Sequence, residues 1–176
     1  MMLAQLNASG RAEFTAALGH LFEHSGWVAE ETWARRPFRD AAQLHAELCA
    51  TMRAAAPERK LTLIHAHPDL AGRLARQRQL TADSTREQAS AGLDRLGDAE
   101  LAEFQRLNTA YRARFGFPFI ICARLNAKDT ILAAMKARIA NSPAAEREAA
   151  LAEIEKIARL RLHDLLQRKE ATDEHR

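Results

Sequence analysis

The sequence predicts an all-α protein: a single-domain bundle of about eight helices with an irregular buried segment near 115–123. Good helix formers, chiefly Ala, Leu, Glu, Gln and Arg, dominate its 176 residues. Apolar residues recur every three or four positions, which is the spacing of the buried face of a helix. We expect the domain to span 1–168, followed by a polar C-terminal tail at 169–176.

Four helices are expected before residue 70. The first two span 11–24 and 26–35, the third begins at Asp40, and the fourth begins at Pro57. Gln43 lies three residues after Asp40, as in a capping box. Leu44, Leu48 and Met52 then repeat every four residues and predict a core stripe. Pro37 and Pro68 end the second and fourth helices, because proline lacks the N–H that a helix interior needs.

The second half of the sequence predicts four further helices. The first runs from Ser84 to about Gly97, the second begins at Asp98, and the last two span about 128–140 and about 144–168. Their expected N-caps are Ser84, Asp98, Asn126 and Ser142, whose side-chain oxygens accept from first-turn N–H groups. Between the second and third of these helices lies FGFPFIICA, residues 115–123. This run is apolar but contains glycine and proline, so it predicts a buried, mostly extended connection.

Composition excludes several classes of protein. Apolar residues make up 47% and charged residues 28%, as in a globular domain and unlike a disordered chain. No apolar run approaches the roughly 18 residues of a membrane-spanning helix, and we expect no secretory signal. The formal charge of +3 comes from basic residues interspersed with acids, which does not require a nucleic-acid surface. Cys49 and Cys122 lack metal-site spacing and predict reduced thiols in a cytoplasmic protein.

The run His65-Ala66-His67-Pro68-Asp69 is the sharpest local feature. A metal pair is disfavoured, because side chains two positions apart do not share a helix face. A metal-dependent amidohydrolase barrel would also need about 250 residues. Two interpretations of His67 stay open. Either it ends a helix and hydrogen-bonds a last-turn carbonyl, or it acts as a general acid or base beside the turn that Pro68 fixes.

Glu87 and Arg161 each allow a structural and a functional interpretation. Glu87 completes a capping box with Ser84, or it faces a polar cleft, since it lies roughly 200° around the helix from the apolar stripe. Arg161 lies on the apolar stripe of the last helix. Either its stem packs there while its head reaches the edge, or its guanidinium holds a carboxylate or carbonyl.

Two stretches of backbone also suit a polar ligand. The helix start near Ser84 would offer N–H groups to an anionic substrate. The extended run 115–123 has N–H and C=O groups that no helix pairs, and a ligand is one way to pair them. The residues alone therefore indicate an all-α protein with a His/Glu/Arg pocket.

Taken together, these segments resemble the 2-oxo-4-hydroxy-4-carboxy-5-ureidoimidazoline (OHCU) decarboxylase family of uric acid degradation. The resemblance spans about residues 6–166. Its most specific blocks are HPDLAG at 67–72, SxxEQxxAGL at 84–93 and FGFPFI at 115–120. Gly26 departs from the family pattern, because many members carry proline before the tryptophan.

The resemblance implies an all-α fold and a decarboxylation to (S)-allantoin that needs no cofactor and no metal. It implies that His67 and Glu87 are the catalytic pair. The implied substrate-binding residues are Pro68, Ser84, Thr85, Arg86, Gln88, Phe119, Ile120, Ile121, Cys122, Ala123 and Arg161. It further implies a homodimer that engages neither nucleic acid nor a membrane.

Two other functions compete with the decarboxylase hypothesis. The first is another lyase or hydrolase that acts on a related ureido compound in the same pocket. The second is a non-enzymatic, arginine-rich helical module that binds nucleic acid or a protein, which predicts strongly salt-sensitive binding. The scattered charges, without a basic face, disfavour the second.

Overall fold

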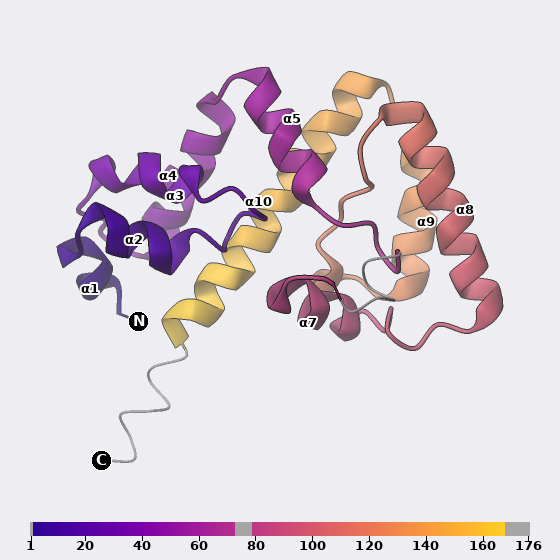
Figure 1. Cartoon of the computed structure of the whole chain (residues 1–176), viewed down its shortest axis with the longest axis horizontal. Helices are drawn as coiled ribbons and strands as arrows, with labels where there is room; N and C mark the ends of the chain where they lie inside the picture. The colour runs from indigo at the N-terminus through magenta and orange to yellow at the C-terminus, as the bar shows by residue number, and fades with distance from the viewer. Residues whose placement is uncertain (1, 73–78, 168–176) are drawn as a thin grey trace, which may run out of the picture. The chain divides into compact units, whose positions relative to one another are not determined.

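The computed structural model describes residues 2–72 and 79–167 (Figure 1). These residues form nine α-helices, two short 3-10 helices and no strand, which confirms the all-α prediction. The prediction of about eight helices agrees with the nine among the described residues, of which one was not expected. The missed helix is α1 (Leu3–Ala8), whose six residues hold a single buried side chain, Leu6, and so show no apolar period. The expected tail at 169–176 lies outside the described residues.

The chain divides into two compact units. The first comprises the chain up to Ala66 and again from Glu155, and the second comprises His67–Ile154. The helix α10 (Pro143–Gln167) contributes residues to both.

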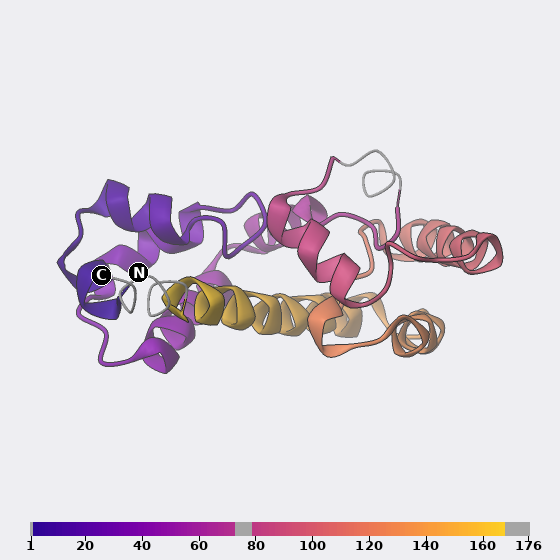
Figure 2. The ribbon, with the colours of Figure 1, turned by 90° about the horizontal axis from the view of Figure 1, so that it is seen from below.

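The first unit contains six complete elements besides the end of α10. They are α1, α2 (Arg11–Leu18), α3 (Trp27–Thr32), the 3-10 helix η1 (Trp33–Arg35), α4 (Ala41–Ala54) and α5 (Pro57–Ala66). Within it α3 packs against both α2 and α4 (Figure 2). The stripe predicted on α4 is confirmed, since Leu44, Leu48 and Met52 are fully buried. The second predicted helix does stop before Pro37, but the first ends at Leu18, because the chain turns at Gly19.

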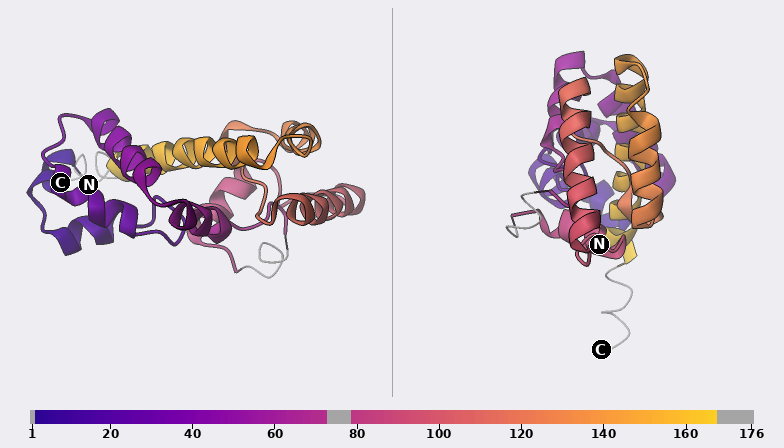
Figure 3. Two further views of the ribbon diagram at one scale, coloured as in Figure 1. Left: turned by 90° about the horizontal axis from the view of Figure 1, so that it is seen from above. Right: turned by 90° about the vertical axis from the view of Figure 1, so that its right-hand side faces the viewer.

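The second unit contains four complete elements and the start of α10. They are α7 (Ala82–Ser90), α8 (Asp98–Phe115), the 3-10 helix η2 (Ala123–Leu125) and α9 (Lys128–Arg138). The helices α8 and α9 lie side by side (Figure 3). Their buried side chains, among them Phe104, Tyr111 and Met135, form the core of this unit with Phe117 and Phe119.

Two of the predicted N-caps are confirmed and three are wrong. Asp40 Oδ1 accepts from the N–H of Gln43 at 2.7 Å, and Ser142 Oγ accepts from Ala145 at 3.2 Å. The other three helices begin after Thr81, Gly97 and Ala127 instead of Ser84, Asp98 and Asn126. Thr81 Oγ1 caps α7 and Glu100 accepts from the N–H of Gly97 at the start of α8, whereas α9 starts after Ala127 without a side-chain cap. The Asn126 side chain instead donates to the carbonyl of Cys122 at 2.9 Å.

The helix that was expected to reach Gly97 ends at Ser90. Gly92 adopts a left-handed conformation with φ +78°, and Leu93 N–H returns to the carbonyl of Gln88 at 3.0 Å. This is the hydrogen-bond pattern with which a glycine terminates a helix. The glycine therefore outweighs the helix-forming residues that follow it.

The buried connection predicted at 115–123 is confirmed over 117–122, whereas Phe115 is the last residue of α8 and Ala123 the first of η2. The helix α8 ends at Phe115, Gly116 takes φ +79°, and the chain then runs extended and buried through Cys122. The connection ends in η2.

No helix within 2–72 or 79–167 combines the length and the apolar character that crossing a membrane requires.

Gly116 provides a test of this turn. A side chain at φ +79° is strained, so Gly116→Ala is expected to lower the free energy of unfolding by about 1 kcal/mol. Gly116→Asn should lose less, because asparagine tolerates this conformation better. Urea unfolding of the three proteins measures the difference, and an alanine variant as stable as the wild type would contradict it.

Candidate active site

His67 lies at the start of the second unit, directly after the last residue of α5. Its side chain is 6% exposed, whereas His65 is exposed. The two histidines therefore have different surroundings. Within the described ranges no group of three or more His, Cys, Asp or Glu side chains is arranged to hold a metal ion.

The turn after His67 is built for one conformation. Ala71 has φ +49°, and Gly72 N–H donates to the carbonyl of Asp69 at 3.3 Å. A Cβ at Gly72 would lie 2.7 Å from the Cβ of Asp69, so only glycine fits there. The helix α8 holds the turn from the side: Arg112 Nε lies 2.9 Å and 3.0 Å from the two Asp69 oxygens, and Asn108 Nδ2 donates to the carbonyl of Leu70 at 2.9 Å.

Gln88 joins α7 to the same turn. Its Oε1 accepts from the N–H of Ala71 at 3.0 Å, and the side chain is buried. Because the turn carries His67 and α7 carries Glu87, this buried hydrogen bond fixes the backbones that bear both side chains.

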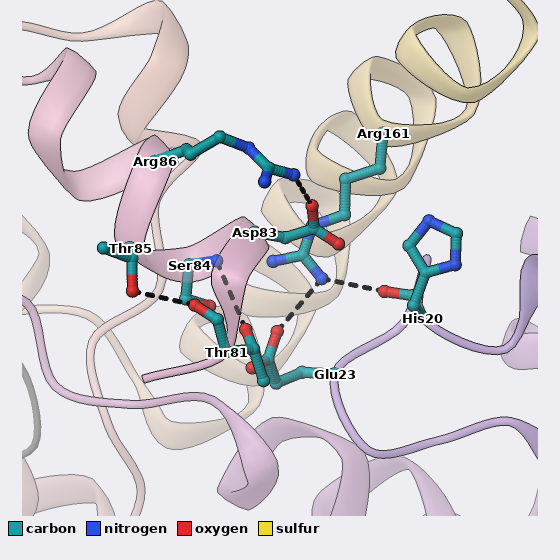
Figure 4. Close-up of polar contacts among 8 residues, drawn as sticks. All are labelled: His20, Glu23, Thr81, Asp83, Ser84, Thr85, Arg86 and Arg161. Carbon is teal, nitrogen blue, oxygen red and sulfur yellow. Dashed lines mark hydrogen bonds and ion pairs between the residues drawn. The ribbon is translucent and has the colours of Figure 1, made fainter. Parts of the chain in front are cut away.

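The remaining α7 residues of the expected site, Ser84, Thr85 and Arg86, make polar contacts near the start of their own helix (Figure 4). Ser84 is buried, and its N–H donates to Thr81 Oγ1 at 3.2 Å. Thr85 and Arg86 are exposed and bonded within their own helix: Thr85 donates to the carbonyl of Thr81 at 2.9 Å, and Arg86 pairs with Asp83. The helix start near Ser84 that we expected to bind an anion thus lies earlier, and the Ser84 N–H is already used.

Glu87 lies in the middle of α7 because the helix starts at Ala82. The capping-box interpretation of Glu87 with Ser84 is therefore wrong, since Ser84 is not the N-cap. Burial raises the pKa of the Cys122 thiol, and the negative charges of Glu153 and Glu87 raise it further. Glu87 thus lies close enough to act on Cys122, in agreement with the packing of α7 against η2.

The segment Phe119–Ala123 is buried along its whole length. The carbonyl of Ile120 accepts from Arg138 Nη1 at 2.8 Å, and the N–H of Cys122 donates to Glu153 Oε2 at 2.8 Å. The N–H groups of Phe119, Ile120 and Ile121 reach no acceptor among residues 2–72 and 79–167. Buried N–H groups are almost always paired, so these three suit a polar ligand.

Arg161 lies in the first unit, on α10, and is buried. Its Nη1 donates to Glu23 Oε2 at 3.0 Å and to the carbonyl of His20 at 3.1 Å (Figure 4). The other expected site residues, from His67 to Ala123, all belong to the second unit. In that unit the structure brings together the turn after His67, α7 and the segment 119–123.

Sequence reasoning missed two residues that hold this segment, Arg138 and Glu153. Both lie in helices with many charged positions, and in such helices a charged residue is expected to face solvent. No periodicity or motif distinguishes them from their neighbours. The buried His67, the half-buried Glu87 and the buried backbone donors of 119–121 therefore belong to one unit, and side chains of this kind are suited to proton transfer on a small polar molecule.

Comparison with known proteins gives one consistent family. The OHCU decarboxylase family model matches residues 7–163. The OHCU decarboxylase of the fish Amia calva is 40% identical over 167 residues, covering 95% of each chain. That of Haloferax volcanii is 41% identical over 162 residues, covering 92% of this chain and 94% of its own.

Two solved structures share the fold. A crystal structure of (S)-allantoin synthase superposes with a TM-score of 0.75 at 34% identity, over 94% of this chain and 54% of that longer one. A crystal structure of OHCU decarboxylase in the presence of (S)-allantoin gives a TM-score of 0.68 at 25% identity, over 89% of this chain and 99% of that one. With its fold, its motifs and nearly its whole length accounted for, this chain belongs to the OHCU decarboxylase family.

Proposed function

We propose that this protein decarboxylates OHCU to (S)-allantoin, the last step in the conversion of urate to allantoin. The observation that carries the proposal is the meeting, in one compact unit, of the turn after His67, the helix of Glu87 and the buried segment 119–123. The family membership of the chain and the fold shared with an (S)-allantoin synthase support it.

The chemistry explains why these groups suffice. The substrate carries its carboxylate on a ring carbon that also bears a hydroxyl and adjoins a C=N bond. When the bond to the carboxylate breaks, CO₂ leaves and the electron pair enters the conjugated ring. The pair forms a double bond to the neighbouring, ureido-bearing carbon, and the nitrogen of the C=N bond takes up a proton. The hydroxyl then loses its proton and becomes a ring carbonyl, while the ureido-bearing carbon takes up a proton from one face, which sets the (S) configuration. No further electron sink is needed, and we therefore propose that the reaction requires neither a metal nor an organic cofactor.

We assign the proton to His67 and the orientation of its imidazole to Glu87. Histidine is the side chain most often used for general acid–base catalysis, and the buried imidazole of His67 is suited to exchange a proton with the substrate hydroxyl or ring. The Glu87 carboxylate would in addition accept from the ureido or ring N–H groups. Pro68, Ser84, Thr85, Arg86, Gln88 and the segment 119–123 would line the substrate. Arg161, oriented by Glu23, would contact a substrate oxygen.

We also propose a cytoplasmic homodimer that binds neither nucleic acid nor a membrane. Both cysteines of the chain, Cys49 and Cys122, are free thiols, as is usual in a reducing compartment. The dimer is inferred from the family resemblance.

Circular dichroism during uric acid oxidation tests the function. Uricase and hydroxyisourate hydrolase generate the substrate in place, with and without this protein. We expect a rapid (S)-allantoin signal that needs no added metal and survives a chelator. Slow racemic allantoin in both samples, with the protein folded, would reject the proposal. Turnover of another ureido compound, or steeply salt-dependent binding of DNA or RNA, would then favour one of the competing functions.

His67→Asn is expected to lower kcat by about 10²-fold or more, because asparagine cannot exchange a proton. His65→Asn is the matched control: the same substitution two positions away, on an exposed side chain, should keep wild-type turnover. Near-normal turnover by His67→Asn would overturn the assignment.

Glu87→Gln is expected to lower kcat by about 10²-fold or more, because glutamine cannot serve as a catalytic carboxylate. Glu100→Gln provides the control. Glu100 pairs with Lys128 and accepts from Gly97 N–H, so the substitution alters a carboxylate outside the site and should leave turnover intact. A fully active Glu87→Gln enzyme would exclude a catalytic carboxylate at this position.

A further inference from the structure

The two peptide groups on either side of Ile121 are each held by a charged side chain of the second unit. The carbonyl of Ile120 accepts from Arg138 Nη1 at 2.8 Å, and the N–H of Cys122 donates to Glu153 Oε2 at 2.8 Å. The two anchors come from different helices, α9 and α10. The sequence analysis assigned no role to either residue.

Peptide planarity converts these anchors into an orientation for Ile121. In a trans peptide the C=O and the N–H point in opposite directions. The Ile120–Ile121 peptide is held by its carbonyl, so the N–H of Ile121 points away from Arg138. The Ile121–Cys122 peptide is held by its N–H, so the carbonyl of Ile121 points away from Glu153. Neither group of Ile121 bonds to a residue that the structure describes.

Arg138 is itself held rigidly. Its Nε donates to Glu146 Oε1 at 2.8 Å, and its guanidinium lies over the Phe119 ring, 4.4 Å from the centroid. Glu146 is fully buried and also accepts from Tyr111 and Asn141. The guanidinium therefore cannot move without leaving a buried carboxylate uncompensated, which is costly.

Glu153 belongs to the same neighbourhood as the catalytic carboxylate. The negative charges of Glu153 and Glu87 both raise the pKa of the Cys122 thiol. The anchored peptides thus lie beside the residue proposed to act in catalysis.

We propose that Arg138 and Glu153 are positioning residues: they orient the N–H and the C=O of Ile121 so that this residue binds the N–H and C=O edge of a ureido or cyclic urea group of the substrate. The inference rests on the proposed function, because it assigns the recognition of that substrate to a particular backbone residue. Neither side chain touches the substrate. Both act through the peptide groups that they hold.

A substitution of Glu153 gives the clearest test, because this side chain is partly exposed and its replacement leaves no cavity in the core. Glu153→Met removes the acceptor of the Cys122 N–H at similar length, and Glu153→Gln keeps an oxygen that can accept it. Two quantities are measured well below each variant's melting temperature: KM and kcat with substrate generated in place, and the affinity for (S)-allantoin by calorimetry. Glu148→Met, at an exposed position of the same helix, is the matched control.

We expect Glu153→Met to raise KM and weaken (S)-allantoin binding by about tenfold each, as the misplacement of one hydrogen bond would, with kcat within about threefold of wild type. Glu153→Gln should restore both KM and affinity, and Glu148→Met should match the wild type. Arg138→Lys should shift KM in the same direction, since a lysine cannot hold both Glu146 and the Ile120 carbonyl with a fork. If Arg138→Lys does not fold, the comparison of Glu153→Met with Glu153→Gln decides the inference.

Wild-type KM and affinity in Glu153→Met overturn the inference, and so does a lower melting temperature without any change in KM. Either result leaves the proposed function intact as long as the wild-type protein makes (S)-allantoin. A wild-type protein that makes none rejects the proposed function, and the inference with it.

Discussion

The second unit depends on the hydrogen bonds made to one buried carboxylate, that of Glu146. It has no exposed surface and accepts hydrogen bonds from Tyr111 on α8, Arg138 on α9 and Asn141 before α10. A buried charge is tolerated only when it is paired and hydrogen-bonded, so these elements are required to meet at one point. Burial and then the Glu146 carboxylate raise the pKa of Tyr111, which keeps its hydroxyl protonated as a donor.

The same cluster supports the non-helical backbone of the site. Arg138 bonds both Glu146 and the carbonyl of Ile120, and the Tyr111 ring meets the Phe119 ring edge-on at 5.3 Å. A helix uses its N–H groups internally, so an all-α protein has few backbone donors for a ligand away from helix ends. An extended segment supplies them, but only if something other than a helix holds it. The charged cluster has that role here, and it makes the connection at 117–122 a rigid part of the fold.

The backbone that carries His67 and Glu87, the residues proposed to act in catalysis, is held in a similar way by polar contacts. Gln88 bonds the turn that follows His67, and Asn108 and Arg112 hold that turn from α8. The proposed decarboxylation, in which no cofactor accepts electrons, relies on the placement of one proton donor and a few hydrogen-bond donors. A fold in which each of these sits on an anchored backbone suits that requirement.

The sequence by itself determined the all-α class, most of the helices, the caps at Asp40 and Ser142, the extended run at 117–122, and the motifs that carry the family and the His67 and Glu87 hypotheses. These follow from local preferences: apolar period, capping chemistry, and the backbone limits of glycine and proline. Only the tertiary structure decided that Thr81 rather than Ser84 caps α7, which removes the capping role of Glu87. It alone revealed Glu146, Arg138 and Glu153, because a charged residue in a helical sequence looks the same whether it faces water or a partner. Its burial depends on side chains far away in the chain, and no local pattern records where those will lie.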